Sequence, residues 1–187
     1  MVVTQEPAHR GARARTRAAI VDAAFAQLAL DPSATLGTIA DAAGVGRTTL
    51  HRYFPERSDL LDALLEHAGH RLEEATRCAR PEDGTARSAV VRLSQEYLEL
   101  GDLLTVIFSG TIDATCIPDP DGQDPILALV RKGHADGSID PELTDDWVLG
   151  IVWSQLYNAW EILRGRQVSR HDVVRQLVRT IDKAIAA

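Results

Sequence analysis

Apolar side chains recur at helical spacing along nearly the whole chain, and this periodicity constrains the fold more than any other feature. In residues 14–30 the side chains of Ile20, Ala24, Phe25 and Leu28 fall on one stripe, and comparable stripes continue toward the C-terminus. No segment shows a convincing apolar–polar alternation of the kind typical of a β-strand, and no internal repeat is visible. The sequence of 187 residues therefore predicts an all-α protein of about nine helices with a real core.

Several helix starts are marked by side chains that commonly cap a helix N-terminus. Thr35 and Thr144 precede helical stretches, Asp124 is followed by a proline at the first helical position, and Ser169 has an aspartate three residues on. Gly44 can adopt the positive φ that a sharp turn between two short helices requires. The expected helices cover residues 14–30, 36–42, 47–53, a long stretch capped by Ser58, 85–100, 102–114, a stretch from Pro125, 145–164 and a stretch after Ser169.

Charge is distributed unevenly along the chain. The formal net charge is −7 overall, which by itself argues against a nucleic-acid partner. Residues 1–58, however, carry seven arginines against five acids, and residues 59–187 carry thirteen basic residues against twenty-two acids. A basic N-terminal part on an acidic remainder is expected if only the N-terminal part meets an anionic polymer.

Motifs of metal-binding, redox or catalytic chemistry do not stand out. Cys78 and Cys116 fit no ligand or redox spacing and are expected to be reduced thiols. His67 and His70 are interpreted as surface residues of a long helix. Hydrolase and nucleotide-binding fingerprints do not appear, so we predict no metal, no cofactor and no enzymatic activity. Without a signal peptide or a transmembrane run, a cytoplasmic location is expected.

The stretch "AGVGRTTLHRYFPERSDLL", residues 43–61, joins a glycine turn to a short polar helix and then to a leucine-rich helix. Val45 and Leu50 are expected to face inward, which leaves Arg47, Thr48 and His51 on the outer face. Two short helices joined in this way form a helix-turn-helix, whose second helix fits the major groove of DNA. The leucine-rich helix that follows argues against a winged-helix protein, which would continue into a hairpin.

The run from residue 17 to residue 61 resembles the DNA-binding domain of the TetR family of bacterial transcriptional regulators. The remainder resembles the family in its helical layout and its length, and in the stretch "LVRKGHADGSIDPELTDDW", residues 129–147. The matching features are Ile20, Ala23, Ala24, Phe25, Thr35, Ile39, Ala40, Ala43, Gly44, Val45, Thr49, Leu50, Tyr53, Phe54, Arg57 and Leu60.

The resemblance implies roles for individual residues of the head. Arg47 and Thr48 occupy positions of base-contacting side chains, whereas Thr35, Thr49, Tyr53 and Arg57 occupy positions that usually touch phosphates. Two positions depart from the family pattern. His51 replaces a common tyrosine, so it is expected to read a different base or to titrate, and Gly46 replaces a common capping serine, which weakens the start of the helix.

The C-terminal part is expected to supply dimerisation and sensing. The last two helices are apolar along one side, and in the family such helices pair with their twofold mates in a four-helix bundle; the alternative is that these faces complete the monomer core. A small, mainly apolar effector is expected nearer the middle of the chain. The residues predicted to line its site are Tyr97, Leu103, Leu104, Ile107, Phe108, Thr111, Trp153 and Tyr157.

Together these features predict a ligand-responsive transcriptional regulator, with residues 1–57 as the arm and helix-turn-helix domain and residues 58–187 as the ligand-binding and dimerisation domain. We expect a repressor that binds a pseudo-palindromic double-stranded operator as a homodimer and does not associate with membranes. The alternative is an all-helical small-molecule-binding protein or enzyme whose head only resembles a DNA reader. Salt dependence separates the two, because DNA affinity falls steeply as salt rises.

Overall fold

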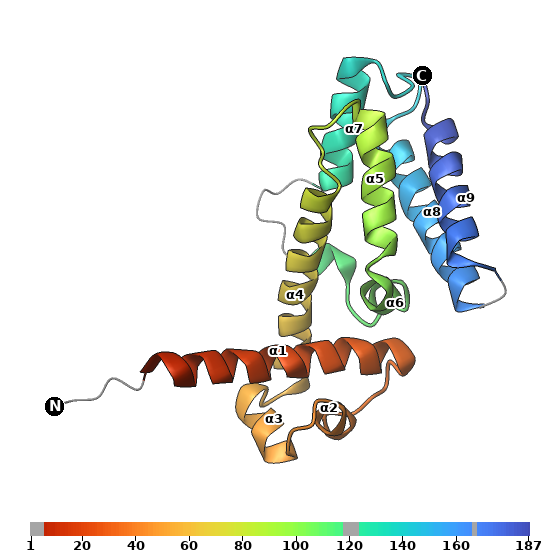
Figure 1. Cartoon of the computed structure of the whole chain (residues 1–187). Coiled ribbons are helices and arrows are strands. Elements are labelled where there is room, and N and C mark those ends of the chain that lie inside the picture. Colours follow the sequence, from red (N-terminus) through yellow and green to blue (C-terminus); the bar gives the residue numbers. More distant parts are fainter. Residues whose placement is uncertain (1–5, 118–123, 166–167) are drawn as a thin grey trace. The chain divides into compact units, whose positions relative to one another are not determined.

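The computed structural model describes the backbone of residues 6–117, 124–165 and 168–187, and the side chains of these ranges from residue 11 onward. This part of the chain contains nine α-helices and one short 3₁₀ helix, which confirms the predicted all-α fold (Figure 1). The helices are α1 (Glu6–Leu30), α2 (Leu36–Ala42), α3 (Arg47–Tyr53), α4 (Arg57–Cys78), α5 (Ala86–Leu98), α6 (Gly101–Phe108), η1 (Ala114–Cys116), α7 (Pro125–Asp136), α8 (Asp145–Arg164) and α9 (Arg170–Ala184).

The chain forms two compact units. The first contains residues 1–68 with residues 105–117, and the second contains residues 69–104 with residues 118–187. Helices α4 and α6 therefore contribute to both units. The domain boundary between residues 57 and 58 stays a prediction, because compactness does not by itself define what each segment does.

In the first unit, α2 packs against α1 and against α3. The core of this head is made of side chains that the helical spacing turns inward, and Ile20, Ile39 and Leu50 are wholly buried. Phe25 and Phe54 are 3% and 2% exposed, so both aromatic rings also belong to this core. Burying a large apolar side chain stabilises the folded state by about 1.5–3 kcal/mol. The head is therefore held by hydrophobic packing, and its polar residues are left for the surface.

The second unit is a bundle in which α5, α7, α8 and α9 lie side by side (Figure 1). Each helix contributes wholly buried residues at helical spacing, among them Val90, Val130, Val152 and Ile181. The last helix has the strongest separation of faces: Val173, Leu177 and Ile181 point into the core, whereas the side chains between them are exposed or half-buried. This pattern confirms that apolar spacing, rather than composition, identifies the helices.

Four of the five predicted N-terminal caps are present, and Ser58 is the exception. Each capping side chain accepts a hydrogen bond from a backbone amide two or three residues further on, at distances between 2.8 and 3.3 Å. Such a bond satisfies one of the amides that a helix N-terminus leaves without a partner in the helix. The confirmed caps are Thr35, Asp124, Thr144 and Ser169.

Several predicted helix ends were wrong. Helix α4 begins at Arg57, so Ser58 lies inside the first turn, and the carboxylate of Asp59 accepts the Glu56 amide at 2.8 Å instead. Helix α6 ends at Phe108 rather than at residue 114, because Gly110 turns the backbone into the left-handed region with φ 71°. Helix α5 ends at Leu98 rather than at residue 100. Helix α1 extends back to Glu6, since alanine and arginine favour a helix before its apolar stripe begins.

Residues 129–147, the stretch with family resemblance outside the head, form a close-packed corner of the second unit. A Cβ atom on Gly133 would lie 2.5 Å from Cγ1 of Ile139, which is wholly buried, so only glycine admits this contact. Ile139 also bridges Ala186 at the end of the chain. The Ser138 side chain and the Ala86 amide donate hydrogen bonds to Asp136 and lower the pKa of its carboxyl. This stretch is therefore explained by packing and capping.

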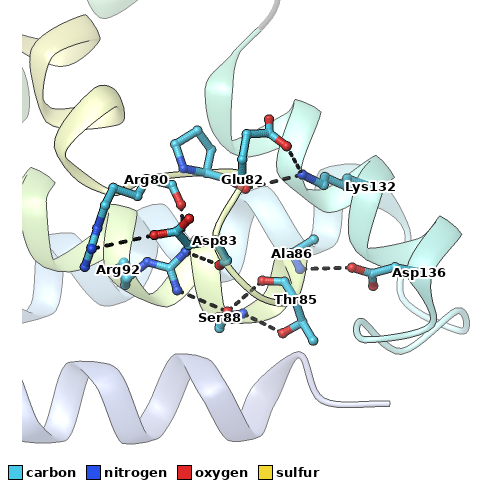
Figure 2. Close-up of polar contacts among 10 residues, drawn as sticks. Arg80, Glu82, Asp83, Thr85, Ala86, Ser88, Arg92, Lys132 and Asp136 are labelled. Atoms are coloured by element: carbon cyan, nitrogen blue, oxygen red, sulfur yellow. Dashed lines mark hydrogen bonds and ion pairs between the residues drawn. The ribbon is translucent and has the colours of Figure 1, made fainter.

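The connector between α4 and α5, residues 79–85, is fastened by side chains of two helices (Figure 2). The guanidinium of Arg92 on α5 donates to the carbonyls of Ala79, Arg80 and Asp83 at 2.6–2.8 Å, and to the Ser88 hydroxyl at 3.1 Å. Arg80 has a positive φ of 48°, which is uncommon for a residue other than glycine. The connector thus holds its shape through one arginine that serves several backbone carbonyls at once. Lys132 on α7 adds an ion pair with Glu82 at 2.7 Å.

Candidate nucleic-acid interface

A tight turn of residues 43–46 joins α2 to α3. Gly44 has a φ of 66°, as its position in the sequence predicts, and no side chain would be tolerated there without strain. The amides of Gly44 and Val45 donate to the carbonyls of Asp41 and Ala40 at 3.1 and 3.0 Å, so the turn is closed by its own backbone. The two helices therefore have the short, fixed junction of a helix-turn-helix.

Helix α3 separates its residues into a buried and an exposed face. Leu50 is wholly buried and Phe54, which ends the helix, is 2% exposed. Arg47, Thr48, His51 and Arg52 are exposed, and Thr49 and Tyr53 are half-buried. Gly46 provides no side-chain cap for α3, as the sequence indicates. The exposed set consists of cations, hydroxyls and an imidazole, which are the groups that hydrogen-bond to base edges and phosphates.

The guanidinium of Arg47 lies against Gly37 of α2. A Cβ atom at Gly37 would be 3.2 Å from the guanidinium carbon and nitrogens, which is tighter than ordinary van der Waals contact. Because the end of an arginine side chain is flexible, a methyl group there would displace the guanidinium rather than unfold the head. Gly37 therefore helps to aim Arg47, a role that sequence reasoning missed because the two residues are ten positions apart and belong to different helices.

Arg57 binds backbone inside the head. Its guanidinium donates to the carbonyl of Ala34 at 2.6 Å and to the carbonyl of Pro32 at 3.1 Å. Thr35 follows directly and caps α2, with its hydroxyl oxygen 3.2 Å from the Thr38 amide. Arg57 thus positions the segment that starts α2, in addition to the phosphate contact predicted for it. The loop is further ordered because the Ser33 hydroxyl and amide donate to Asp31, which lowers the pKa of that carboxyl.

His51 lies on the exposed face of α3, as predicted from its spacing. Its Nδ1 is 3.3 Å from the carbonyl oxygen of Pro55. When Nδ1 carries the proton for this bond, Nε2 is left as the ring nitrogen available to an outside partner. The geometry therefore orients the imidazole without using all of its hydrogen-bonding capacity, and whether it reads a base or titrates stays a prediction.

The residues predicted to bind an effector divide between the two units. In the second unit Leu103 and Leu104 are wholly buried and Tyr97 is 2% exposed. The rings of Tyr97 and half-buried Trp153 have centroids 6.0 Å apart, tilted by 33°. Tyr157 is 46% exposed and its ring lies 5.4 Å from that of Trp160. Ile107, Phe108 and Thr111 are half-buried residues of the first unit.

Comparison with known proteins decides the family. The profile described as "Bacterial regulatory proteins, tetR family" matches residues 20–64, which contain the helix-turn-helix. The HTH-type transcriptional repressor LfrR of Mycolicibacterium smegmatis is 32% identical over 190 residues, and the match covers 98% of this chain and 97% of that protein. The chain belongs to the TetR family. Its head therefore binds DNA, and the protein is a transcriptional repressor rather than an enzyme.

Solved structures of TetR proteins have the same fold. The crystal structure of the TetR-like regulator LfrR from Mycobacterium smegmatis in complex with proflavine matches with a TM-score of 0.75 and 32% identity, over 94% of this chain and 99% of that one. A TetR-family regulator from Marinobacter aquaeolei VT8 matches with a TM-score of 0.73 at 18% identity, over 95% of this chain and 98% of that one, and shows the fold alone.

Two further findings concern the described part of this TetR protein. None of its helices there is long and apolar enough to cross a membrane. Over the same residues, histidine, cysteine, aspartate and glutamate side chains do not gather in a group of three or more that could hold a metal ion. Cys78 and Cys116 are both exposed free thiols.

Proposed function

We propose that this TetR protein represses transcription as a homodimer on a pseudo-palindromic operator, and that a small, mainly apolar effector releases it. The observation that carries the proposal is the exposed polar face of α3, which is held in place by buried Leu50 and Phe54. Base reading is assigned to Arg47, Thr48 and His51. Phosphate contacts are assigned to Thr35, Thr49, Tyr53 and Arg57. Residues 1–57 then form the DNA-binding domain and residues 58–187 the remainder.

The DNA-reading assignment separates two arginines by their effects. Replacing Arg47 with alanine should relax preference at its base by roughly 1–3 kcal/mol, because a bidentate donor to a base edge is lost. Replacing Arg57 with alanine should weaken all sequences alike, because phosphates carry no sequence information and the tether at Ala34 is lost as well. Selection from genomic fragments, followed by titration of the enriched sites, measures both effects. Failure of the wild-type protein to enrich an inverted repeat contradicts the proposal.

The dimer is assigned to the outer faces of α8 and α9. On α8, exposed Trp147, Gly150, Ser154, Tyr157 and Glu161 recur every three or four residues and so form one stripe. Trp147 is 65% exposed and Tyr157 is 46% exposed, an unusual surface position for large aromatic side chains. Their exposure favours a contact with a second copy, and it favours this role for Tyr157 over the effector contact expected from its sequence position.

Gly150 supports a helix–helix contact on this stripe. Glycine inside a helix costs about 0.5–1 kcal/mol relative to alanine. A Cβ atom at Gly150 would meet nothing within 4 Å, so packing inside the protomer does not require a glycine there. Close approach of another backbone would require it. A groove between α8 and α9 lies beside this stripe, and its lining includes Ala159, Ile162 and Leu177. The surface next to the stripe is therefore concave.

The effector site is assigned to the aromatic pair Tyr97 and Trp153. Leu103 and Leu104, which follow Tyr97 in the sequence, are assigned to the same site. LfrR is seen in complex with proflavine, a planar aromatic compound, and this chain aligns with nearly all of LfrR. A compound of that shape suits aromatic side chains, which offer flat apolar surface. A ligand releases DNA only if it binds the DNA-incompetent state more tightly than the competent one.

Proflavine tests the effector assignment. Replacing Trp153 with alanine should weaken proflavine binding to the free protein by about tenfold, the effect of losing one aromatic contact. Leu30→Ala is the control, because Leu30 is 80% exposed and belongs neither to the assigned effector site nor to the assigned dimer contact. A planar cation can also displace the protein by binding DNA directly, and that effect does not depend on Trp153. If the dye acts through the protein, release of the operator should require about tenfold more dye for Trp153→Ala than for wild type. Equal dye concentrations for wild type and Trp153→Ala contradict the assignment.

A further inference from the structure

A surface hollow lies between α1 and α3 in the head. It is lined by Ala12, Arg13, Thr16, Arg52 and Tyr53, and we call it the arginine hollow. Its volume is about 360 Å³, and it is open to solvent. The guanidinium carbons of Arg13 and Arg52 each lie 5.7 Å from the centroid of the Tyr53 ring. One aromatic ring is thus flanked by two cations that come from different helices.

The two positive charges of the arginine hollow are not neutralised by the part of the chain whose side chains are described. Within that part, no carboxylate lies at ion-pair distance from Arg13 or Arg52, whereas nearby Arg17 pairs with Glu66 at 3.2 Å. The Tyr53 ring attracts each cation only weakly at an exposed site. Two like charges beside one ring repel each other, and an anion bound between them attracts both and so offsets that repulsion.

The donors of the arginine hollow suit a phosphate. Arginine offers a fork of N–H groups that matches two phosphate oxygens. Tyr53 belongs to the same lining, and a tyrosine hydroxyl can donate to a phosphate oxygen. The hydroxyl of Thr16 donates to the carbonyl of Ala12 at 3.1 Å, so Thr16 shapes the wall and is not the principal donor.

We propose that the arginine hollow binds a phosphate of the DNA backbone beside the bases that α3 reads. The proposal rests on the DNA binding proposed above and adds Arg13 and Arg52 to its contacts. Arg52 and Tyr53 follow His51 on α3, so an anion held between them lies next to the reading face. Because Arg13 belongs to α1, one phosphate is held by two helices at once, which fixes the angle of α3 on the duplex.

Arg15 provides a matched control on the same helix. It is exposed, like Arg13, and it carries the same charge. Two residues along an α-helix correspond to a rotation of about 200°, so Arg13 and Arg15 point to nearly opposite sides of α1. A general effect of positive charge on DNA affinity would be similar at the two positions. A specific site would respond to Arg13 alone.

The test is operator titration at several salt concentrations with wild type, Arg13→Gln, Arg52→Gln, the double variant and Arg15→Gln. Each hollow variant should reduce the slope of log affinity against log salt by about 1 for each head bound, and Arg15→Gln should reduce it by clearly less. The base preference from sequence selection should stay that of wild type. Ethylation of one phosphate in each half-site should block the wild-type protein and cease to matter for the double variant.

The outcomes separate this inference from the proposed function. If wild type selects an operator but the hollow variants keep its salt slope and its ethylation pattern, the arginine hollow is overturned and the function stands. An equal loss of slope for Arg15→Gln and Arg13→Gln also overturns it, since the effect is then general. If wild type shows no salt-dependent DNA binding at all, the proposed function fails and the hollow fails with it.

Discussion

Replacing Gly150 with arginine should leave the protein monomeric and lower its operator affinity by about 10²–10⁴, the usual gain from linking two binding heads. The side chain of the new arginine has open space in the protomer, since nothing lies within 4 Å of the Cβ position. Folding of the protomer should therefore survive, and a helix-favouring residue replaces glycine. At the surface of a second copy the same side chain would prevent close approach of α8. Light scattering and operator titration measure the two effects.

The control for this variant is Ala128→Arg. Ala128 is an exposed small residue on α7, so the change adds the same charge and bulk to another helix of the second unit. It should leave both the mass in solution and the operator affinity close to wild type. A Gly150→Arg protein that remains dimeric and binds the operator normally would show that the outer face of α8 is not the contact between copies.

Replacing Arg92 with methionine should lower the free energy of unfolding by roughly 2–3 kcal/mol, because carbonyls near the protein interior lose a charged donor. The carbonyls of Arg80 and Asp83 depend on this one guanidinium (Figure 2), and so does the carbonyl of Ala79. Ala79 is 1% exposed, so its carbonyl is the least able to recover a hydrogen bond from water. Arg80, which has a positive φ, also loses the hydrogen bond that its carbonyl accepts from Arg92.

Urea unfolding with Arg87→Met as the control measures this effect. Arg87 is on the same helix and makes a surface ion pair with Asp182 at 3.2 Å, which is expected to contribute no more than about 1 kcal/mol. The two variants make the same chemical change, so their difference isolates the connector. Equal destabilisation by Arg92→Met and Arg87→Met would mean that the carbonyls are satisfied without the arginine.

Features that depend on near neighbours in the sequence could be predicted. The caps Thr35, Asp124, Thr144 and Ser169 each act within three residues, so spacing was sufficient to find them. The same is true of the turn at Gly44. The end of α6 could not be predicted in this way. Glycine is compatible with a helix as well as with a turn, and the apolar residues on both sides of Gly110 continue a helical pattern.

Only the part of the site that lies on a single helix, α3, could be predicted from the sequence. The exposed face of α3 follows from the spacing of Leu50 and Phe54, and it contains the residues expected to read bases. The contact of Arg47 with Gly37 and the gathering of Arg13 and Arg52 around Tyr53 depend on how helices pack. Effector and dimer residues depend in addition on a second molecule, so helical spacing does not assign them.

The hydrogen bonds of Arg57 have a consequence for how this repressor would dissociate from DNA. Arg57 begins α4 and holds the carbonyls of Pro32 and Ala34, directly before the cap of α2. Helix α2 leads through a closed turn into α3. A shift at the start of α4 should therefore move α2 and the recognition helix α3 together, as one rigid group. In the proposed dimer, each head would then keep its contacts with one half-site when the effector binds. The effector would change the distance between the two recognition helices of the proposed dimer. The affinity for DNA that contains a single half-site should therefore not respond to the effector.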